Sequence, residues 1–351
     1  MDLPHRVVVG GRVIERVHEY IEKPPGLALI VTGRTTYEIA GKIVKDSLED
    51  HGRSVEVTHI SKPLISEAEK VAERARDFDV IIGVGGGKNI DVAKYASFKA
   101  SKDFISVPTN ASHDGIASHI ASLYDGNVRR SISTKPPVLV VADVTVISNA
   151  PYRFTRAGVG DAISNITAVR DRLLAHKLRG EYYSEYAAEL SRLSAELVLR
   201  YAPIIKEGLL EGIRVLIKSL ISSGVAMAIA GSSRPASGSE HLFAHALERI
   251  RPGVALHGEM VGVGTIMMAY LHGIDRKGIR EALIHVGAPV DYEGLGVEPI
   301  DIIKALTTAH KIRKRFTILG ENGITREAAV RLAERTLVIP RGSVDVRHQE
   351  S

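Results

Sequence analysis

The chain has 351 residues and a formal net charge of +5, with 14 histidines, no cysteine and no tryptophan. The absence of cysteine excludes disulfides, thiolate zinc fingers and iron–sulfur clusters, so any bound metal must use nitrogen and oxygen ligands. The 46 Lys and Arg residues are scattered among 41 acidic ones without a basic run, which argues against a nucleic-acid partner and favours a modest attraction for small anions.

The length predicts two domains of ordinary size. The first residues, Met-Asp-Leu-Pro-His-Arg, show no basic segment followed by an apolar stretch, as a secretory signal would. The most apolar stretch, residues 209–231, carries three charged side chains, which is typical of a buried helix rather than of a membrane span. We therefore expect a soluble cytoplasmic protein without membrane insertion.

The first part of the chain alternates between strand and helix patterns. Strands are predicted at residues 27–33, 54–60, 79–83 and 103–108. Of the helices between them, the first ends near residue 50, the second spans 67–77 and the third spans 89–100. A turn signal at 124–127 indicates a β-ribbon over 122–133, before a last strand at 137–143. The alternation implies a doubly wound, mainly parallel sheet with Rossmann-like nucleotide binding.

After about residue 150 the strand patterns stop. Helical patterns continue, interrupted by Gly or Pro at residues 180, 203, 231–235, 252–253, 287–289 and 294–296. We predict a dinucleotide-binding α/β domain over residues 1–152 and an all-helical metal- and substrate-binding domain over 153–351. The cleft between two such domains is the expected ligand site.

A glycine-rich turn, Gly83-Val-Gly-Gly-Gly-Lys-Asn-Ile-Asp91, follows the third predicted strand. Its glycines let the backbone approach a ligand, and the following helix N-terminus suits a phosphate. It is not a Walker loop, because Ile82 and Asn89 replace required residues, and Lys88 stands where GxGxxG needs its third glycine. The turn indicates a pyrophosphate site, with a tight turn that binds no ligand as the alternative.

The next strand ends in Pro-Thr109-Asn-Ala-Ser112-His-Asp114-Gly. Ligands bind at the carboxyl ends of the strands in open α/β sheets, so these hydroxyls and this acid are well sited for cofactor and substrate. The alternative is that Ser112 or Asp114 only caps a helix.

Three histidines, His241, His245 and His257, fall within a short stretch, and Asp161 lies far upstream. Imidazole nitrogen and carboxylate oxygen bind divalent cations such as Zn²⁺, and three protein ligands leave one position for water or substrate. His241 and His245 share a helix face, but no Glu follows His241, so the HExxH pattern of metalloproteases is absent. A Pro-Gly pair places His257 on a separate segment. For any single histidine, a packing role is the alternative.

Several of these segments occur in a defined order over nearly the whole chain: Gly-Gly-Gly-Lys-Asn-Ile-Asp91, Pro-Thr-Asn-Ala-Ser-His-Asp114-Gly, Gly-Val-Gly-Asp161-Ala-Ile-Ser-Asn, Ser-Gly-Ser-Glu-His241-Leu-Phe-Ala-His245 and Leu-His257-Gly-Glu-Met-Val-Gly-Val-Gly-Thr. Together they resemble the archaeal sn-glycerol-1-phosphate dehydrogenases. The wider superfamily includes glycerol dehydrogenase, iron-containing alcohol dehydrogenases and 3-dehydroquinate synthase. The resemblance implies the dehydroquinate synthase-like fold, with two domains and a metal site in the cleft.

The resemblance also implies which residues bind which group. A zinc ion would be held by Asp161, His241 and His257, and the substrate would be bordered by Asp114, Asp161 and His245. The cofactor, NAD(H) or NADP(H), would be contacted by Gly87, Lys88, Asn89, Ile90, Asp91, Thr109, Asn110, Ala111, Ser112 and Ser118. The implied reaction is reduction of dihydroxyacetone phosphate to sn-glycerol-1-phosphate, which supplies the backbone of archaeal membrane lipids. We expect a homo-oligomer.

The chemistry of the residues agrees with this reaction. Hydride transfer to a ketone builds negative charge on its oxygen, and Zn²⁺ with an open position stabilises that charge. Asp161 and His245 are the expected catalytic residues, with His245 suited to relay a proton near neutral pH. The alternatives are a glycerol dehydrogenase acting on an uncharged polyol, a lyase similar to 3-dehydroquinate synthase, and a non-catalytic nucleotide- or nucleic-acid-binding protein.

Overall fold

The computed structural model describes residues 2–22 and 26–345 of the chain. They form two compact units. The first combines the residues up to Thr155 with Gly208–Ser232, and the second combines Arg156–Glu207 with the residues from Ser233 onward. The functional division into domains at residue 152 stays a prediction.

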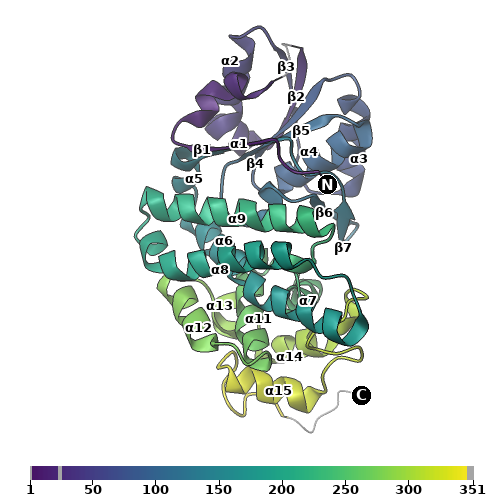
Figure 1. Cartoon of the computed structure of the whole chain (residues 1–351), viewed down its shortest axis with the longest axis vertical. Helices are drawn as coiled ribbons and strands as arrows, with labels where there is room; N and C mark the ends of the chain where they lie inside the picture. Colours follow the sequence, from purple (N-terminus) through teal and green to yellow (C-terminus); the bar gives the residue numbers. More distant parts are fainter. Residues whose placement is uncertain (1, 23–25, 346–351) are drawn as a thin grey trace. The chain divides into compact units, whose positions relative to one another are not determined.

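The first unit is built on a six-stranded sheet in the order β1-β8-β5-β4-β2-β3, in which every neighbouring pair is parallel (Figure 1). Its strands are β1 (Arg6–Gly10), β2 (Leu27–Thr32), β3 (Ser54–His59), β4 (Val80–Gly85), β5 (Asp103–Pro108) and β8 (Leu139–Asp143). The predicted parallel sheet is confirmed. The sequence analysis missed β1, a five-residue edge strand whose first two residues are exposed, so it carries little of the apolar signal of a buried strand.

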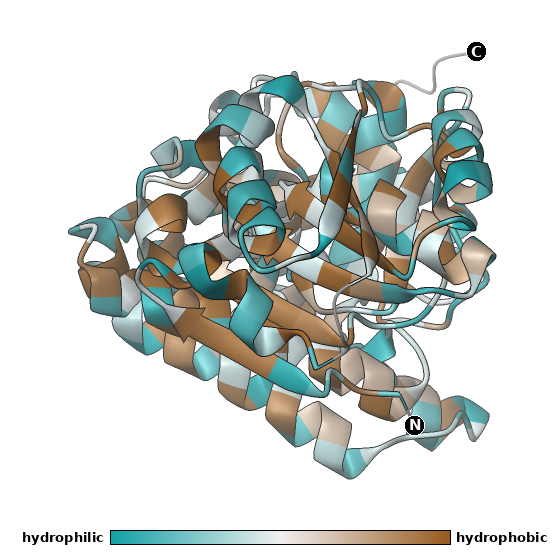
Figure 2. Ribbon diagram, turned by 90° about the horizontal axis from the view of Figure 1, so that it is seen from above, coloured by the Kyte–Doolittle hydropathy of each residue, from teal (hydrophilic) through white to brown (hydrophobic). Residues whose placement is uncertain are grey.

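Helices cover both faces of this sheet. Side chains of β2 and β4 alternate between two hydrophobic clusters, with Leu29 and Ile81 in one and Ile30 and Ile82 in the other. The first cluster is closed by α3 (Ile65–Ala75) and α4 (Gly87–Ala100), the second by the 3₁₀ segment η1 (Val13–Tyr20) and α2 (Lys42–Glu49). Because both faces are buried, the central strands are hydrophobic along most of their length, as the brown ribbons of Figure 2 show.

Smaller elements complete this unit. The β-ribbon is confirmed as the antiparallel pair β6 (Ile120–Asp125) and β7 (Val128–Ser133). The short helical segments are α1 (Arg34–Thr36), η2 (Tyr37–Gly41), η3 (Asp114–Ile116) and α5 (Val144–Ser148).

The long helix α9 (Leu210–Ala230) also belongs to the first unit. It is the one described helix that is long and apolar enough to cross a membrane, with a mean hydropathy of 1.7, but 56% of that window is buried within the protein. The core helix of a soluble protein passes the same test, so the finding is weak evidence for a span.

A Cβ on Gly224 would lie 2.7 Å from the backbone nitrogen of Ser118, so α9 packs directly against the loop that holds η3.

The second unit is helical, and no strand follows β8 among the residues described. It contains α7 (Asn165–Arg179), α8 (Glu185–Lys206), η4 (Arg234–Ala236), α10 (Ser239–Ile250), α11 (His257–Leu271), α12 (Arg276–His285), α13 (Tyr292–Leu295), α14 (Pro299–Thr308), η5 (Ala309–Lys311) and α15 (Arg326–Arg335), together with most of α6 (Tyr152–Ile163). The predicted break at Pro203 is wrong, because α8 runs through this residue and ends at Lys206. Pro203 removes one internal hydrogen bond of α8, and the helix continues past it for three residues only.

Candidate functional site

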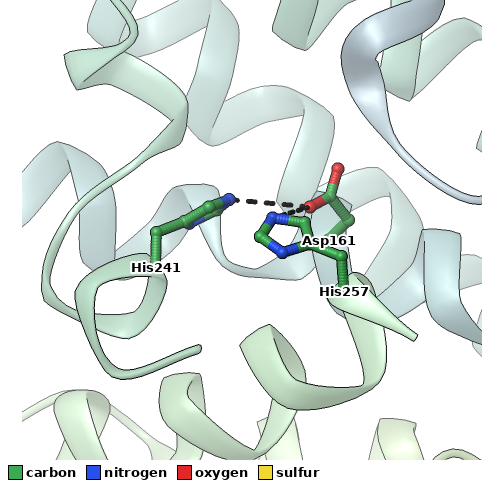
Figure 3. A group of neighbouring side chains, drawn as sticks. All are labelled: Asp161, His241 and His257. Atoms are coloured by element: carbon green, nitrogen blue, oxygen red, sulfur yellow. Dashed lines mark ion pairs between the residues drawn. The ribbon is translucent and has the colours of Figure 1, made fainter. Parts of the chain in front are cut away.

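Asp161, His241 and His257 converge in the second unit, from α6, α10 and α11 (Figure 3). One ligand atom of each lies within 4.8 Å of the other two. The Oδ1 atom of Asp161 is 3.6 Å from His241 Nε2 and 4.0 Å from His257 Nε2. Two imidazole nitrogens and one carboxylate oxygen at this spacing fit a divalent cation with bonds of about 2 Å after small side-chain movements. The structure therefore brings together the three residues that the sequence analysis grouped.

A close crossing of α6 and α11 makes this convergence possible. A Cβ on Gly160 would lie 2.2 Å from the carbonyl oxygen of Gly258, and a Cβ on Gly258 would lie 2.0 Å from that of Ala157. Real Cβ atoms do not approach so closely, so the two backbones touch only because glycine occupies both positions. Asp161 and His257 are the immediate neighbours of these glycines in sequence, and the crossing sets the distance between their side chains.

Glu240 orients the second ligand. Its carboxylate is fully buried and lies 2.9 Å from His241 Nδ1, and it also accepts hydrogen bonds from Gly238 N–H (2.5 Å) and Thr167 Oγ1 (2.8 Å). A proton on Nδ1 donated to Glu240 leaves the Nε2 lone pair facing Asp161, which is how carboxylates support metal-bound histidines. The sequence analysis assigned Glu240 no role, although it directly precedes His241 in a quoted segment.

The electrostatics of this cluster favour a cation. Burial alone lowers the pKa of His241, but hydrogen bonds with Asp161 and Glu240 and their negative charges outweigh it and raise the pKa to about 9. Burial likewise opposes ionisation of Glu240, yet its hydrogen bonds and the charge of His241 hold its pKa below the ordinary value. The two carboxylates thus stabilise positive charge at this point, which a proton or a metal ion can supply.

His245 lies beside this cluster, one turn further along α10. Its ring centroid is 5.2 Å from that of His257 and 6.4 Å from that of His241. Its Nε2 atom is 3.0 Å from Arg313 Nη2, and its Nδ1 is 3.8 Å from Glu248 Oε2. The side chain therefore lies next to the group of three residues, and its contact with substrate stays a prediction.

The glycine-rich segment of the first unit is a tight turn between β4 and α4. Gly85 has φ of 142°, a conformation that favours glycine, and a Cβ there would lie 1.9 Å from Asn89 Nδ2. That nitrogen donates to the carbonyl oxygen of Val84 (3.1 Å) and to Thr36 Oγ1 (2.9 Å). Asn89 thus braces the turn, and α4 begins directly after the strand, as helices that bind phosphate at their N-terminus do.

The loop after β5 lies against the same turn. A Cβ on Gly86 would be 2.7 Å from Asn110 Nδ2, and a Cβ on Gly87 would be 2.0 Å from His113 Nε2. The two segments that were assigned to the cofactor are therefore adjacent, and the two glycines let the loop side chains reach the start of α4.

The other residues predicted at the cofactor differ in their contacts. Lys88 Nζ donates to the carbonyl oxygen of Ser61 (3.0 Å), and Ile90 lies fully buried in a hydrophobic cluster. Asp91 lies 3.2 Å from Lys94 Nζ. With their side chains engaged in this way, Lys88, Ile90 and Asp91 offer a nucleotide chiefly their backbone. The remaining predicted residues are buried or half-buried: Thr109, Ala111, Ser112 and Ser118.

Lys94 is fully buried and fixes the loop after β5, a role that the sequence analysis did not find. Its ammonium group donates to the carbonyl oxygens of Gly115 (2.7 Å) and Ile120 (2.8 Å) and to Asp91. Burial lowers the pKa of Lys94, while the negative charge of Asp91 opposes this shift. The buried pair therefore links α4 to the backbone on both sides of the predicted cofactor residue Ser118.

Asp114 begins the short segment η3, and its Oδ2 accepts a hydrogen bond from Ser223 Oγ on α9 (2.9 Å). The helix cap that was considered for Ser112 or Asp114 is instead His113, whose Nδ1 accepts from Gly115 N–H (2.9 Å). Asp114 is thus held by α9, within the same unit as the glycine-rich turn.

Comparison with known proteins places this chain in a family. A glycerol-1-phosphate dehydrogenase (NAD(P)+) of Pyrococcus horikoshii is 54% identical over 350 residues, which covers 97% of this chain and 99% of the relative. One from Methanosarcina mazei is 52% identical over 344 residues, covering 97% and 96%. The chain belongs to the glycerol-1-phosphate dehydrogenase family. It is therefore an oxidoreductase, and the resemblance seen in the sequence is confirmed.

Broader comparisons agree with the fold of this family. Residues 8–151 match the family described as iron-containing alcohol dehydrogenase. The structure of glycerol dehydrogenase from Schizosaccharomyces pombe superposes with a TM-score of 0.82 at 22% identity, covering 96% of this chain and 89% of that one. An iron-containing alcohol dehydrogenase from Thermotoga maritima gives 0.71 at 19% identity, covering 96% and 99%. At such identities the likeness shows the fold alone, and it confirms an α/β region followed by a helical one.

Replacing Gly160 by alanine should push α6 away from α11. We expect Gly160→Ala to lower the free energy of unfolding by about 1–3 kcal/mol, as overpacking does, and to weaken binding of divalent cations because Asp161 and His257 move apart. Urea unfolding of the metal-free protein and a zinc titration measure the two effects. Unchanged zinc affinity would show that the crossing does not set the ligand distance.

Removing the charge of Glu240 should weaken metal binding without unfolding the protein. We expect Glu240→Gln to lower zinc affinity by about 10- to 100-fold, the usual effect of losing a group that orients a ligand histidine. Competition with a chromophoric chelator measures the affinity. The control is Glu281→Gln, at an exposed position on α12, which should bind zinc as the wild type does.

Replacing the buried ammonium of Lys94 should destabilise the first unit. Lys94→Met keeps an apolar side chain of similar length but removes the donor of two carbonyl oxygens and Asp91. We expect it to lower the free energy of unfolding by about 1–3 kcal/mol. Urea unfolding measures it. Lys99→Met, on the exposed side of the same helix, should be nearly neutral, and equal effects of the two substitutions would refute the anchoring role of Lys94.

Proposed function

We propose that this protein reduces dihydroxyacetone phosphate to sn-glycerol-1-phosphate with NADH or NADPH, using a zinc ion bound by Asp161, His241 and His257. The observation that carries the proposal is the convergence of these three side chains within 4.8 Å, in a chain whose relatives are named glycerol-1-phosphate dehydrogenase (NAD(P)+). A cytoplasmic location, a homo-oligomeric state and a role in supplying the backbone of membrane lipids belong to the same proposal.

The donor set supports zinc. Two neutral imidazoles and one carboxylate suit a borderline divalent cation, and three protein ligands leave a position for a substrate oxygen. When bound, zinc supplies a Lewis acid that stabilises the negative charge that grows on the carbonyl oxygen during hydride transfer. Glu240 keeps His241 Nε2 directed at Asp161, so the ligand nitrogen is in place before the ion arrives.

His245 is the proposed proton donor to the reduced oxygen. Its Nε2 faces the guanidinium of Arg313, which is always a donor, so Nε2 accepts and the imidazole proton sits on Nδ1, toward Glu248. In this state the ring is neutral. To act as the donor the ring must first take up a proton from solvent at Nε2, once that atom no longer accepts from Arg313. Its place beside His257 is then suited to passing this proton to the product, directly or through a hydroxyl or a water.

The cofactor is proposed to bind at the start of α4. The tight turn at Gly85 and the adjoining loop at Asn110 support a pyrophosphate at the helix N-terminus. The proposed nucleotide contacts remain those of the sequence analysis: Gly87 to Asp91, Thr109 to Ser112, and Ser118. Both NADH and NADPH are expected to serve, because no acidic residue is identified against a ribose hydroxyl.

A product assay before and after chelation tests the proposed reaction. We expect the purified protein to contain zinc, to oxidise NADH or NADPH with dihydroxyacetone phosphate, and to form the sn-1 enantiomer. Chelation should abolish this activity and added zinc should restore it. Oxidation with dihydroxyacetone alone would instead identify a glycerol dehydrogenase, and turnover without net oxidation of NADH would indicate a lyase.

Substitutions separate metal binding from proton transfer. His245→Ala should keep its zinc but lose turnover by about 10²- to 10⁴-fold, the range for removal of a general acid. His241→Ala should lose both the metal and turnover. Metal analysis alongside steady-state kinetics distinguishes them, and loss of zinc from His245→Ala would contradict the role given to this residue.

A further inference from the structure

A basic segment, residues 311–316 (Lys-Ile-Arg-Lys-Arg-Phe), follows α14 and lies against the start and middle of α10. Arg313 Nη2 donates to His245 Nε2 at 3.0 Å. Arg315 donates to the carbonyl oxygen of Ser237 and to its Oγ (3.1 Å), and to Ser233 Oγ (2.9 Å). The sequence analysis gave none of these arginines a role.

Arg315 is held by neutral oxygens. Its partners are hydroxyl and carbonyl groups, and no carboxylate of the described residues lies within ion-pair distance of it. Burial is the main cause that lowers the pKa of Arg315, to about 9, and the positive charges of Arg313 and Arg234 add to the shift against the opposing charges of Glu240 and Asp171. Three guanidinium groups therefore lie close enough to interact in this part of the helical unit.

The distances match the size of the proposed substrate. Arg313 is one hydrogen bond from His245, and the His245 ring is 5.2 Å from the ring of the ligand His257. In dihydroxyacetone phosphate one methylene and one ester oxygen separate the carbonyl carbon from the phosphorus. A molecule whose carbonyl oxygen reaches the group of Asp161, His241 and His257 is therefore long enough for its phosphate to reach Arg313.

We propose that Arg313 binds the phosphate group of the substrate and so selects a phosphorylated triose over an uncharged one. This inference rests on the proposed function. Guanidinium binds phosphate through two parallel hydrogen bonds between opposite charges, an attraction that the neutral acceptor His245 does not supply. Phosphate therefore replaces His245 as the acceptor of Arg313, and this replacement frees His245 Nε2 to face the reacting oxygen.

Charge-matched substitutions on neighbouring residues test the proposal. Arg313→Gln should raise the KM for dihydroxyacetone phosphate by about 10- to 100-fold, the loss of a hydrogen bond to a charged group. The KM for dihydroxyacetone, which has no phosphate, should not rise with it. Arg313→Lys should show a smaller rise in KM than Arg313→Gln, because lysine keeps the positive charge but lacks the paired N–H donors of the guanidinium. The control is Lys314→Gln, which removes the same charge at the next, exposed position and should leave both substrates unaffected.

Binding supplies a readout that does not depend on turnover. Calorimetric titration of the zinc-loaded protein with inorganic phosphate should show weaker binding in Arg313→Gln than in the wild type or Lys314→Gln, at equal zinc content.

A wild type that does not reduce dihydroxyacetone phosphate would overturn the proposed function and this inference with it. A wild type that does, combined with an Arg313→Gln variant of unchanged KM, would overturn the inference alone. An equal fall in turnover on both substrates with unchanged phosphate affinity would also overturn it, because it would show that Arg313 acts only by positioning His245.

Discussion

The contact between the backbones of α6 and α11 determines where chemistry can occur in the helical unit. Gly160 and Gly258 have no side chain between them, and their sequence neighbours are Asp161 and His257. A carboxylate and an imidazole that are remote in sequence thereby come close enough to share a metal ion. The third ligand, His241, comes from α10, and its orientation depends on the buried carboxylate of Glu240. The site is therefore specified as much by residues that allow close approach as by the ligands.

Each unit contains a buried charged side chain that is stabilised by hydrogen bonds to complementary groups. Glu240 is enclosed by donors from Gly238, Thr167 and His241, and Lys94 is enclosed by two carbonyl oxygens and Asp91. An isolated ion would be too costly in such surroundings, and each is tolerated because every strong contact is made to a complementary group. Each ion also lies next to a proposed functional segment, so its hydrogen bonds hold that segment in one conformation.

Much of the fold could be predicted from the sequence because its signals are local. Alternating apolar strands and amphipathic helices gave the sheet, and the turn at Asp125 and Gly126 gave the ribbon. The edge strand β1 was missed because a short, half-exposed strand has a weak pattern. Pro203 misled because α8 continues for three residues beyond it, although a proline inside a helix removes one hydrogen bond. The proposed site was grouped through quoted motifs and a family resemblance. Arg313 was missed because its partner His245 lies on another segment, and Lys94 because the two carbonyl oxygens that it binds belong to the loop after β5. Glu240 directly precedes His241, but nothing in the sequence indicates that its carboxylate is buried and turned toward that ring.

The position of α9 has a consequence for how this protein matures. The polypeptide leaves the α/β unit at Thr155, builds helices of the other unit, and returns with Gly208–Ser232 before leaving again. Because Gly224 packs on the backbone at Ser118 and Ser223 holds Asp114, the loop after β5 acquires its last supports only when the chain through residue 232 has been synthesised. The first unit therefore cannot complete its folding from residues 1–155 alone.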